Sequence, residues 1–294
     1  MLRQIAIILA GALSLSGCGG PDPFEDHEWS QPSPALWQVT APSGEEGWLF
    51  GTIHALPDGL DWQTEQADAA FANAGTLLVE IAELGDAELA ADRFNERANS
   101  PGLPPLLDRV SPQERPALQQ LLTFAQQDED DFADTESWAA ALLLAGSMRS
   151  GEPENGVDRM LITSARADDK PVIGLEGFAA QYQLFDSLPE AEQLDLLLAI
   201  AKEAQNYDPV KPVEAWLTGD LAQLEEIGRN GLLADPELRA ALLDQRNRDW
   251  LAEIRQNIVA GNEPFIAVGA AHMLGQNGLP ALLEADGFVV TRLE

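Results

Sequence analysis

The chain has 294 residues, of which 45% are hydrophobic and 6% aromatic, so it is long enough to bury a sizeable core in one domain or two lobes. Its 17 Lys and Arg residues face 49 Asp and Glu residues, for a formal net charge of -32 at pH 7. Such a surface repels phosphate backbones, which argues against nucleic acid as a partner. The acidity indicates a solvated surface that resists aggregation, with an acidic binding patch as the alternative.

The chain begins with the pattern of a secretory signal. MLRQIAIILAGALSLSGCGG contains a cation at Arg3, an apolar stretch that is short for a membrane-spanning helix, and then small residues. The ending LSGC resembles the lipobox of bacterial lipoproteins. It predicts a lipoprotein signal peptide over residues 1–17 and lipidation of Cys18, with an ordinary secretory signal and a chance cysteine as the alternative.

Lipidation of Cys18 would anchor the protein to a membrane without a spanning helix. The two glycines after it are no acidic retention signal, so the expected location is the bacterial outer membrane, facing the periplasm. Cys18 is the only cysteine, which excludes an intramolecular disulfide and a cysteine-based zinc site. Residues 18–34 are polar and rich in Pro and Gly, which predicts a flexible tether with an exposed, idle His27.

The folded part is expected over residues 35–294. Two runs of alternating residues, 35–40 and 48–53, are joined by a glycine-bearing connection, which predicts a β-hairpin with His54 at its exit. A helix fits residues 63–74, and residues 75–81 form a short apolar strand. This order of strand, helix and strand is typical of a βαβ unit.

The middle of the chain is expected to be helical, over about residues 86–170 and 177–260, with one strand from Pro171 to Leu175 between the two parts. Capping-box patterns beginning at Ser111 and Ser187 each predict a helix start. Asp235 and the proline after it predict the start of one long helix that ends near Gly261.

The end of the chain repeats the pattern of its beginning. Residues 264–270 predict a strand that leads to His272, and a glycine-bearing loop, a helix over 279–286 and a strand over 287–293 follow. The sequence therefore predicts an α/β fold, with a mostly parallel sheet built from both chain ends and a helical lobe inserted between them.

Two of the three histidines share one setting, Gly-x-x-His at the end of a short apolar strand. Ligands bind beyond the carboxyl ends of parallel strands. If the two strands are neighbours, His54 and His272 converge although they lie 218 positions apart (272 minus 54). Imidazole binds a borderline metal or moves a proton near neutral pH, whereas a lone histidine beside a strand is more often structural.

Carboxylates complete the candidate site. Glu80 interrupts an apolar strand, where an unpaired buried charge is costly, and the alternative is an edge strand that faces water. Glu176 follows a second short strand in the same way. Asp158 and Arg159 open a helix, where Asp158 serves the site or only complements the helix dipole.

Arg246 and Asn247 lie within one turn of Trp250 on the long helix. As a polar pair on its inner face, they would hold Glu80 or Glu176, or bind a substrate carboxylate; the alternative is a surface arginine. Trp138 and Trp216 are expected in the core.

These residues stand in segments that together resemble the TraB/GumN family, which also includes PrgY and the animal Tiki proteases. The resemblance runs from about residue 36 to 293 and is most specific in the twin Gly-x-x-His motifs and the closing G-x-x-H-x-x-G-x-x-G-L-P stretch. The segments are LFGTIHALP, LLVEI, NGVD, VIGLEGFAAQYQLFDSLP, EAWLTGD, DQRNRDW and VGAAHMLGQNGLPALLEADGFVV.

The resemblance implies an α/β core like that of erythromycin esterases and the haem-binding ChaN proteins. It also implies, as in Tiki, a metal-dependent peptidase that favours manganese or cobalt. Carried over by motif, His54, Glu80 and His272 would form the site. Four further residues would surround it, namely Asp158, Glu176, Arg246 and Asn247.

Three functions are left open. The first is a metal-dependent, peptidase-like hydrolase, in which His54, His272 and Glu80 hold Mn, Co or Zn and Glu80 or Glu176 relays the proton. The second is a metal-free hydrolase with histidine as the base. The third is a non-catalytic lipoprotein that binds haem, a peptide or another small molecule. The chain has no Gly-x-Ser-x-Gly elbow, no H-E-x-x-H and no Walker loop.

Overall fold

The structure is a computed structural model that describes residues 23–148 and 150–294. The predicted signal peptide and Cys18 lie outside the described residues. Within the described ranges, no helix has both the length and the apolar character needed to cross a bilayer.

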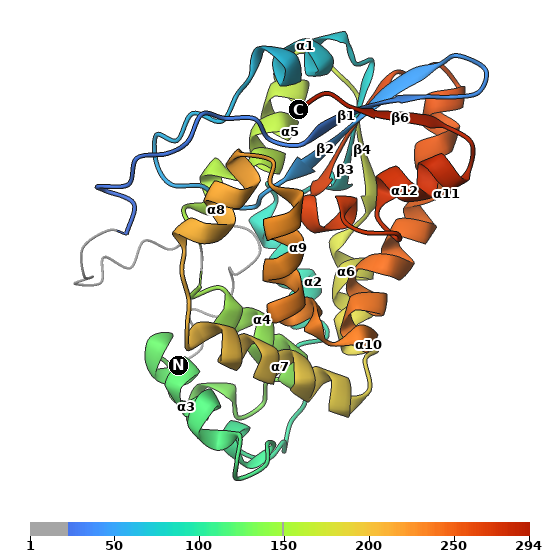
Figure 1. Ribbon diagram of the computed structural model, residues 1–294. Helices are drawn as coiled ribbons and strands as arrows, with labels where there is room; N and C mark the ends of the chain where they lie inside the picture. The colour runs from blue at the N-terminus through green and yellow to red at the C-terminus, as the bar shows by residue number, and fades with distance from the viewer. Residues whose placement is uncertain (1–22, 149) are drawn as a thin grey trace.

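A six-stranded sheet in the order β4-β3-β5-β2-β1-β6 forms the centre of the α/β part (Figure 1). Strands β2 to β5 are mutually parallel, and β1 is antiparallel to both of its neighbours, β2 and β6. The predicted α/β fold with a mostly parallel sheet is confirmed. The strands are β1 (Leu36–Thr40), β2 (Glu46–Thr52), β3 (Thr76–Ile81), β4 (Val172–Glu176), β5 (Pro264–Gly269) and β6 (Val289–Arg292).

Strands from the two chain ends lie side by side. β2 pairs with β5 in a parallel register that places Thr52 opposite Gly269, and β5 pairs with β3 on its other side. All six residues of β5 are buried, as expected for a strand covered on both faces. The hairpin β1–β2 turns at Gly44, whose φ of +103° is a conformation that glycine adopts readily.

Helices cover both faces of the sheet. α1, α5 and α8 pack with alternate strand residues such as Phe50 and Phe265 on one face, and α11 and α12 pack with Leu49 and Ile266 on the other. The helices are α1 (Glu65–Asn73), α2 (Ala87–Asn95), α3 (Arg115–Phe124), α4 (Ser137–Ala145), α5 (Val157–Ala167), α6 (Phe178–Asp186), α7 (Glu190–Ala204), α8 (Val210–Leu217), α9 (Leu221–Asn230), α10 (Pro236–Arg239), α11 (Gln245–Val259) and α12 (Leu279–Ala285).

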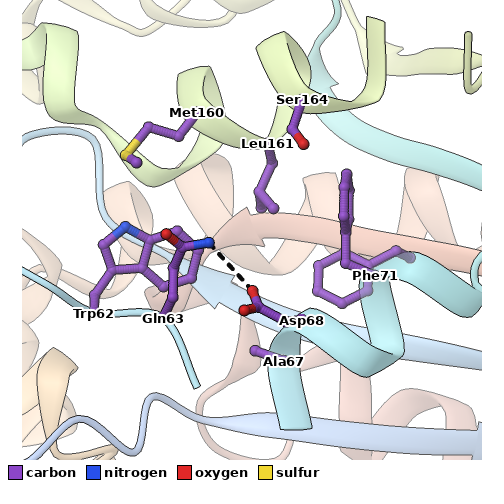
Figure 2. Close-up of a pocket in the computed structure, with 9 residues that line it drawn as sticks. Trp62, Gln63, Ala67, Asp68, Phe71, Met160, Leu161 and Ser164 are labelled. Atoms are coloured by element: carbon purple, nitrogen blue, oxygen red, sulfur yellow. Dashed lines mark hydrogen bonds between the residues drawn. The ribbon is translucent and has the colours of Figure 1, made fainter. Parts of the chain in front are cut away.

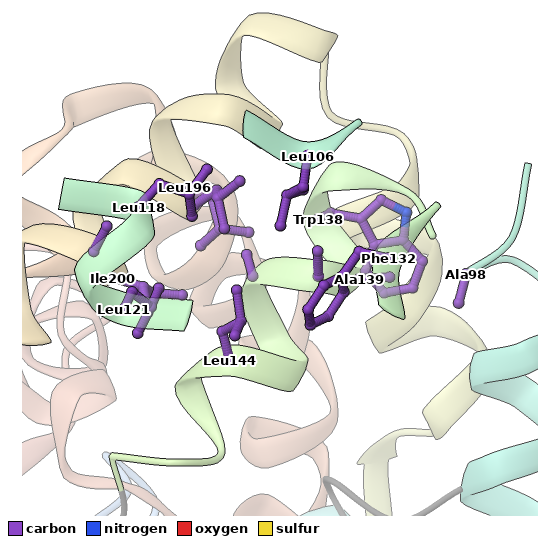
Figure 3. Close-up of a cluster of buried hydrophobic side chains, with 14 of the residues drawn as sticks. Ala98, Leu106, Leu118, Leu121, Phe132, Trp138, Ala139, Leu144, Leu196 and Ile200 are labelled. Atoms are coloured by element: carbon purple, nitrogen blue, oxygen red, sulfur yellow. The ribbon is translucent and has the colours of Figure 1, made fainter. Parts of the chain in front are cut away.

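A helical lobe with its own core extends from one end of the sheet (Figure 1). Its helices α2, α3, α4, α6 and α7 come from the segments before and after β4 and meet around the fully buried Trp138 (Figure 3). Trp216, in contrast, lies in the core beneath the sheet, where its indole nitrogen donates to the carbonyl of Gly51 at 2.8 Å. The expectation that both tryptophans belong to the core is confirmed.

Two predicted helix features differ from the structure. The helix expected from residue 236 to 261 begins as predicted, with the Asp235 side chain accepting from two backbone nitrogens, but a π-helical segment η5 (Ala240–Asp244) interrupts it. The capping box expected at Ser187 is wrong, because its hydroxyl donates to Leu184 O at the end of the preceding helix α6. The Ser187 hydroxyl therefore caps the end of α6 and does not cap the start of the next helix.

The second part of the predicted tether lies against the domain. His27 is half-buried, its ring is 4.4 Å from that of Trp29, and its Nε2 lies 3.6 Å from Glu214 of α8. The nitrogen of Ser33 donates to Leu217 O at 2.8 Å. The expectation of an exposed His27 is therefore wrong, because the aromatic neighbour covers part of it.

Candidate functional site

The candidate residues meet at the carboxyl ends of four neighbouring parallel strands. His54 follows β2, Glu80 is near the end of β3, Glu176 ends β4 and His272 follows β5. Because these strands are consecutive in the sheet, side chains from four distant segments share one edge. The structure thus brings together all four residues that the sequence predicts as catalytic.

The two glycines of the Gly-x-x-His motifs serve different contacts. A Cβ on Gly51 would lie 3.1 Å from the Cα of Ala270, which connects β5 to His272. A Cβ on Gly269 would lie 3.1 Å from Glu80 Oε1 and 3.6 Å from His54 Nε2. Neither glycine has a left-handed φ, so the motif needs the small size of glycine and not its backbone freedom.

His54 is an exposed imidazole held by a buried carboxylate. Its Nδ1 lies 2.6 Å from Asp158 Oδ2, its side chain is 66% exposed and that of Asp158 only 9%. Desolvation by the surrounding side chains would lower the pKa of His54, but the charge and hydrogen bond of Asp158 and the charge of Glu80 outweigh it and raise this pKa to about 9. The free ring atom, Nε2, lies on the side of Gly269.

The first turn of α5 is docked on the His54 segment. Val157 N donates to Ile53 O at 2.9 Å, and a Cβ on Gly156 would lie 2.5 Å from the carbonyl oxygen of His54. The sequence NGVD therefore requires glycine for this close approach. Arg159 contributes its backbone nitrogen, which donates to Asp158 Oδ1 at 2.9 Å.

Arg246 forms the centre of the buried part of the site. Its Nη2 donates to Glu80 Oε2 and to Glu176 Oε1, both at 2.6 Å, and its Nε donates to Glu176 Oε2 at 3.2 Å. Its Nη1 lies 3.0 Å from Leu242 O and 3.1 Å from His272 Nε2. These contacts use all five N–H groups of the guanidinium, so none is left for a substrate.

Burial and neighbouring charges shift the pKa values of the two glutamates in opposite directions. Burial raises the pKa of Glu80, but His272, Arg246 and His54 outweigh it and lower this pKa to about 2. Gly269 N also donates to Glu80 Oε1 at 2.8 Å. Burial raises the pKa of Glu176, against the opposing effect of Arg246. Because its pKa is low, Glu80 is ionised at every physiological pH.

His272 is buried, neutral and fixed in one tautomer. The Nδ2 of Asn247 donates to the carbonyls of His272 and Asn277, at 3.2 and 2.7 Å, so its Oδ1 faces His272 Nδ1 at 2.6 Å and must accept from it. The other ring nitrogen, Nε2, then accepts from Arg246. Burial lowers the pKa of His272 to about 4, and its ring lies 4.5 Å from that of Trp250.

The predicted metal ligands do not fit a resident metal ion in this arrangement. His272 Nε2 accepts from Arg246, and both oxygens of Glu80 also have donors. Among the residues that the structure describes, one acidic or histidine-containing group has its ligand atoms within 4.8 Å of one another and could bind a metal. It lies elsewhere, between α7 and the start of α10, and consists of Glu192, Asp195 and Asp235.

An apolar cavity between α1 and α5 is separate from this site (Figure 2). Its volume is about 160 Å³, and its walls include Trp62, Phe71 and Met160. A hydrogen bond of 3.2 Å from Gln63 to Asp68 lies in its wall. None of the candidate residues lines this cavity, so the ionisable network and the cavity are distinct features.

Sequence reasoning missed two partners of the network. Gln181, in the first turn of α6, donates to Glu176 Oε1 at 3.3 Å, and the carbonyl of Leu242 in the π-helical segment accepts from Arg246. The spacing of Gln181, one helical turn after the strand that ends in Glu176, was a usable signal. The π-helical segment has no such signal, since its residues AALLD read as ordinary helix.

Comparison with known proteins yields one family and two relatives. The TraB/PrgY/gumN family matches residues 35–292. The uncharacterized protein YbaP of Shigella flexneri and that of Escherichia coli (strain K12) are each 25% identical over 253 residues, which cover 85% of this chain and 92% of theirs. No solved structure matches the chain.

Proposed function

The chain belongs to the TraB/PrgY/gumN family, and on this premise we propose that it is a hydrolase in which His54, oriented by Asp158, takes the proton of an attacking water. The observation that carries the proposal is the 2.6 Å contact between His54 Nδ1 and Asp158 Oδ2 beneath an imidazole that is 66% exposed. A buried carboxylate that fixes Nδ1–H leaves Nε2 available to act as a base, which is the arrangement of His–Asp pairs in hydrolases.

The raised pKa of His54 sets the pH dependence of this step. With a pKa of about 9, His54 is mostly protonated at pH 7. The fraction of neutral base therefore rises about tenfold per pH unit until the pKa is reached. We expect kcat/KM to increase with pH up to about 9 for this reason.

The buried network supports His54 without binding the substrate. Arg246 has no free N–H, and it holds Glu80 and Glu176 in place. Glu80, with a pKa of about 2, is too weak a base to relay the proton, but its charge stabilises the imidazolium that forms when His54 takes a proton. Glu80 is thus an electrostatic partner in this proposal and not the proton relay.

The substrate class and the location are parts of the same proposal. Water attack assisted by a histidine suits a carbonyl carbon, so the substrate is a peptide or an ester-type small molecule. The location, a bacterial cell envelope with an outer-membrane anchor at Cys18, rests on the pattern of the first 20 residues alone.

A chelator experiment separates this proposal from its alternatives. The chain without residues 1–17 and with Cys18→Ser is assayed on peptide and ester libraries by mass spectrometry, in EDTA and with added Mn, Co or Zn. We expect cleavage that survives EDTA and is lost in His54→Gln, but not in the control His27→Gln. Activity that needs added Mn or Co identifies a metal-dependent peptidase, and tight binding without a product identifies a ligand-binding protein. A fully active His54→Gln variant rules out the assignment.

A further inference from the structure

We propose that the apolar cavity between α1 and α5 binds a small, uncharged molecule with one ring and one hydrogen-bond acceptor. The cavity shares no residue with the ionisable network around His54, so the inference goes beyond the proposed function. Its walls come from α1 with the two residues before it, from α5 and from β5.

The size and walls of the cavity suit a single ring. Its volume is about 160 Å³, and Trp62, Phe71 and Phe265 contribute three aromatic rings to its walls. Leu161 of α5 adds a buried aliphatic side chain between Trp62 and Phe71 (Figure 2). An apolar cavity of about 150 Å³ inside a protein can bind one benzene molecule. The cavity can therefore hold one six-membered ring.

Trp62 supplies a hydrogen-bond donor that lacks an acceptor. The residue is 4% exposed, and its Nε1 is buried without a hydrogen-bond partner among residues 23–148 and 150–294. Trp216, in the same core, donates to Gly51 O instead. The Nε1 of Trp138 is unpaired too, but Trp138 does not line the cavity. A buried donor without an acceptor is unfavourable, and a ligand that brings an acceptor would remove this cost.

Met160 is a movable cover for this donor. Its side chain lies on the side of the indole that carries the nitrogen (Figure 2). Met160 is 39% exposed on α5. A methionine side chain is unbranched and flexible, so it can rotate and allow the acceptor of a ligand to reach Nε1.

The charges near the cavity favour an uncharged ligand. Asp68 in its wall, together with the net charge of -32, opposes carboxylates and phosphates. A cation would find the ring of Phe71 already in contact with Lys170, whose Nζ lies 4.7 Å from the ring centre. A carbonyl oxygen accepts a hydrogen bond without carrying a charge, so the ligand class is a cyclic or aromatic carbonyl compound of this size.

The test uses the purified full chain and two uncharged probes of similar shape, cyclohexanone and methylenecyclohexane, of which only the ketone has an acceptor. Binding is measured by NMR titration, in which the indole N–H signal of Trp62, assigned by its loss in Trp62→Phe, reports the hydrogen bond. Each probe is compared between proteins, because the two probes differ in their hydration. Neither probe contains a bond that hydrolysis could cleave, so the outcome does not depend on the activity of His54.

We expect Trp62→Phe to weaken the binding of cyclohexanone about tenfold and that of methylenecyclohexane less than about twofold, because an aromatic ring remains and the donor is lost. Trp138→Phe is the matched control, since it removes an unpaired indole N–H outside the cavity. Both affinities should stay within about twofold of the parent in this control. Ala67→Leu, which fills the cavity from α1, should abolish the binding of both probes.

Three results would overturn the inference. The first is a parent protein in which cyclohexanone does not shift the Trp62 signal. The second is a Trp62→Phe variant that weakens both probes equally, since the donor would then have no part in binding. The third is an Ala67→Leu protein that binds cyclohexanone as tightly as the parent. If Trp62→Phe does not fold, the first and third results decide.

Discussion

The two Gly-x-x-His segments share a sequence pattern but place their histidines in opposite surroundings. His54, after β2, is 66% exposed and hydrogen-bonds a carboxylate, which raises its pKa to about 9. His272, after β5, is 4% exposed and hydrogen-bonds an amide, and its pKa falls to about 4. One histidine is a cation at neutral pH, and the other is a neutral acceptor.

The difference shows that the partner of Nδ1 and the exposure of the ring decide the role of each histidine, not the motif. Asp158 reaches His54 from α5 and can stabilise a positive charge. Asn247 reaches His272 from α11 and can only fix its tautomer. Each histidine therefore takes its chemistry from the helix that packs against it.

The largest expected effect distinguishes the two histidines by activity. We expect His54→Gln to lower kcat/KM by about 10²–10⁴, since a general base contributes a factor of this order. The free energy of unfolding should change by less than about 1 kcal/mol, because the ring is mostly exposed. Cleavage assays and urea unfolding of the same preparations check both expectations. Loss of stability in parallel with activity would contradict the division of roles.

The second effect concerns the network behind His272. Arg246→Ala should lower the free energy of unfolding by about 3–5 kcal/mol, because Glu80 and Glu176 lose their shared buried partner. Arg248→Ala, an exposed change on the same helix, should stay within about 0.5 kcal/mol of the parent. Urea unfolding monitored by circular dichroism makes the comparison, and equal losses in the two variants would argue against a central role for Arg246.

Exchange of the two Nδ1 partners should bring the pKa values of the two histidines closer together. Asp158→Asn removes the charge that raises the pKa of His54, which should fall from about 9 towards the ordinary value of 6.5. Asn247→Asp adds a negative charge beside His272, whose pKa should rise from about 4. The chain has only 3 histidines, so NMR titration of the ring protons can follow each one. Unchanged values would show that the partners do not set the difference.

The smallest effect is a pH dependence of stability on opposite sides of neutrality. The folded-state pKa of His54, about 9, is above the ordinary 6.5, so its contribution is complete below pH 6.5 and is lost as the pH rises through 9. The folded-state pKa of His272, about 4, is below 6.5, so its contribution is present above pH 6.5 and is lost as the pH falls through 4.

Unfolding curves at a series of pH values test this pair of limbs. His54→Gln should flatten the alkaline limb by less than about 1 kcal/mol, because an exposed ion pair is screened by water. The acid limb of the same variant should be unchanged. A change in the acid limb would show that His54, and not His272 alone, contributes to the loss of stability at low pH.

The sheet could be predicted from local patterns because its strands carry strong ones. The short apolar runs that end in Gly-x-x-His are the strands β2 and β5, and they pair directly. The interruption before Arg246 could not be predicted, since the residues of η5 have ordinary helical propensity and the π-helical turn depends on packing. His27 was misjudged because a polar segment can still lie on a domain when an aromatic residue such as Trp29 anchors it.

The partnerships within the site were harder to predict than its members. An aspartate in the first turn of a helix is explained equally by the helix dipole, so Asp158 could be linked to His54 only through the docking of α5 at Gly156. For Arg246 the sequence left open a hold on the glutamates, a substrate contact or a surface position. The N–H donors of Arg246 already have acceptors within the protein, so the structure supports the hold on the glutamates.

The position of β5 between β3 and β2 has a consequence for biosynthesis. β3 ends at residue 81 and β5 begins at residue 264, so 183 positions (264 minus 81) must be translated before β5, the strand that separates β3 from β2, exists. At ordinary elongation rates of about 5–20 residues per second, the N-terminal strands wait roughly 10–35 s with open edges. Until β5 emerges, the facing edges of β2 and β3 lack their partner, and unpaired strand edges are prone to incorrect pairing.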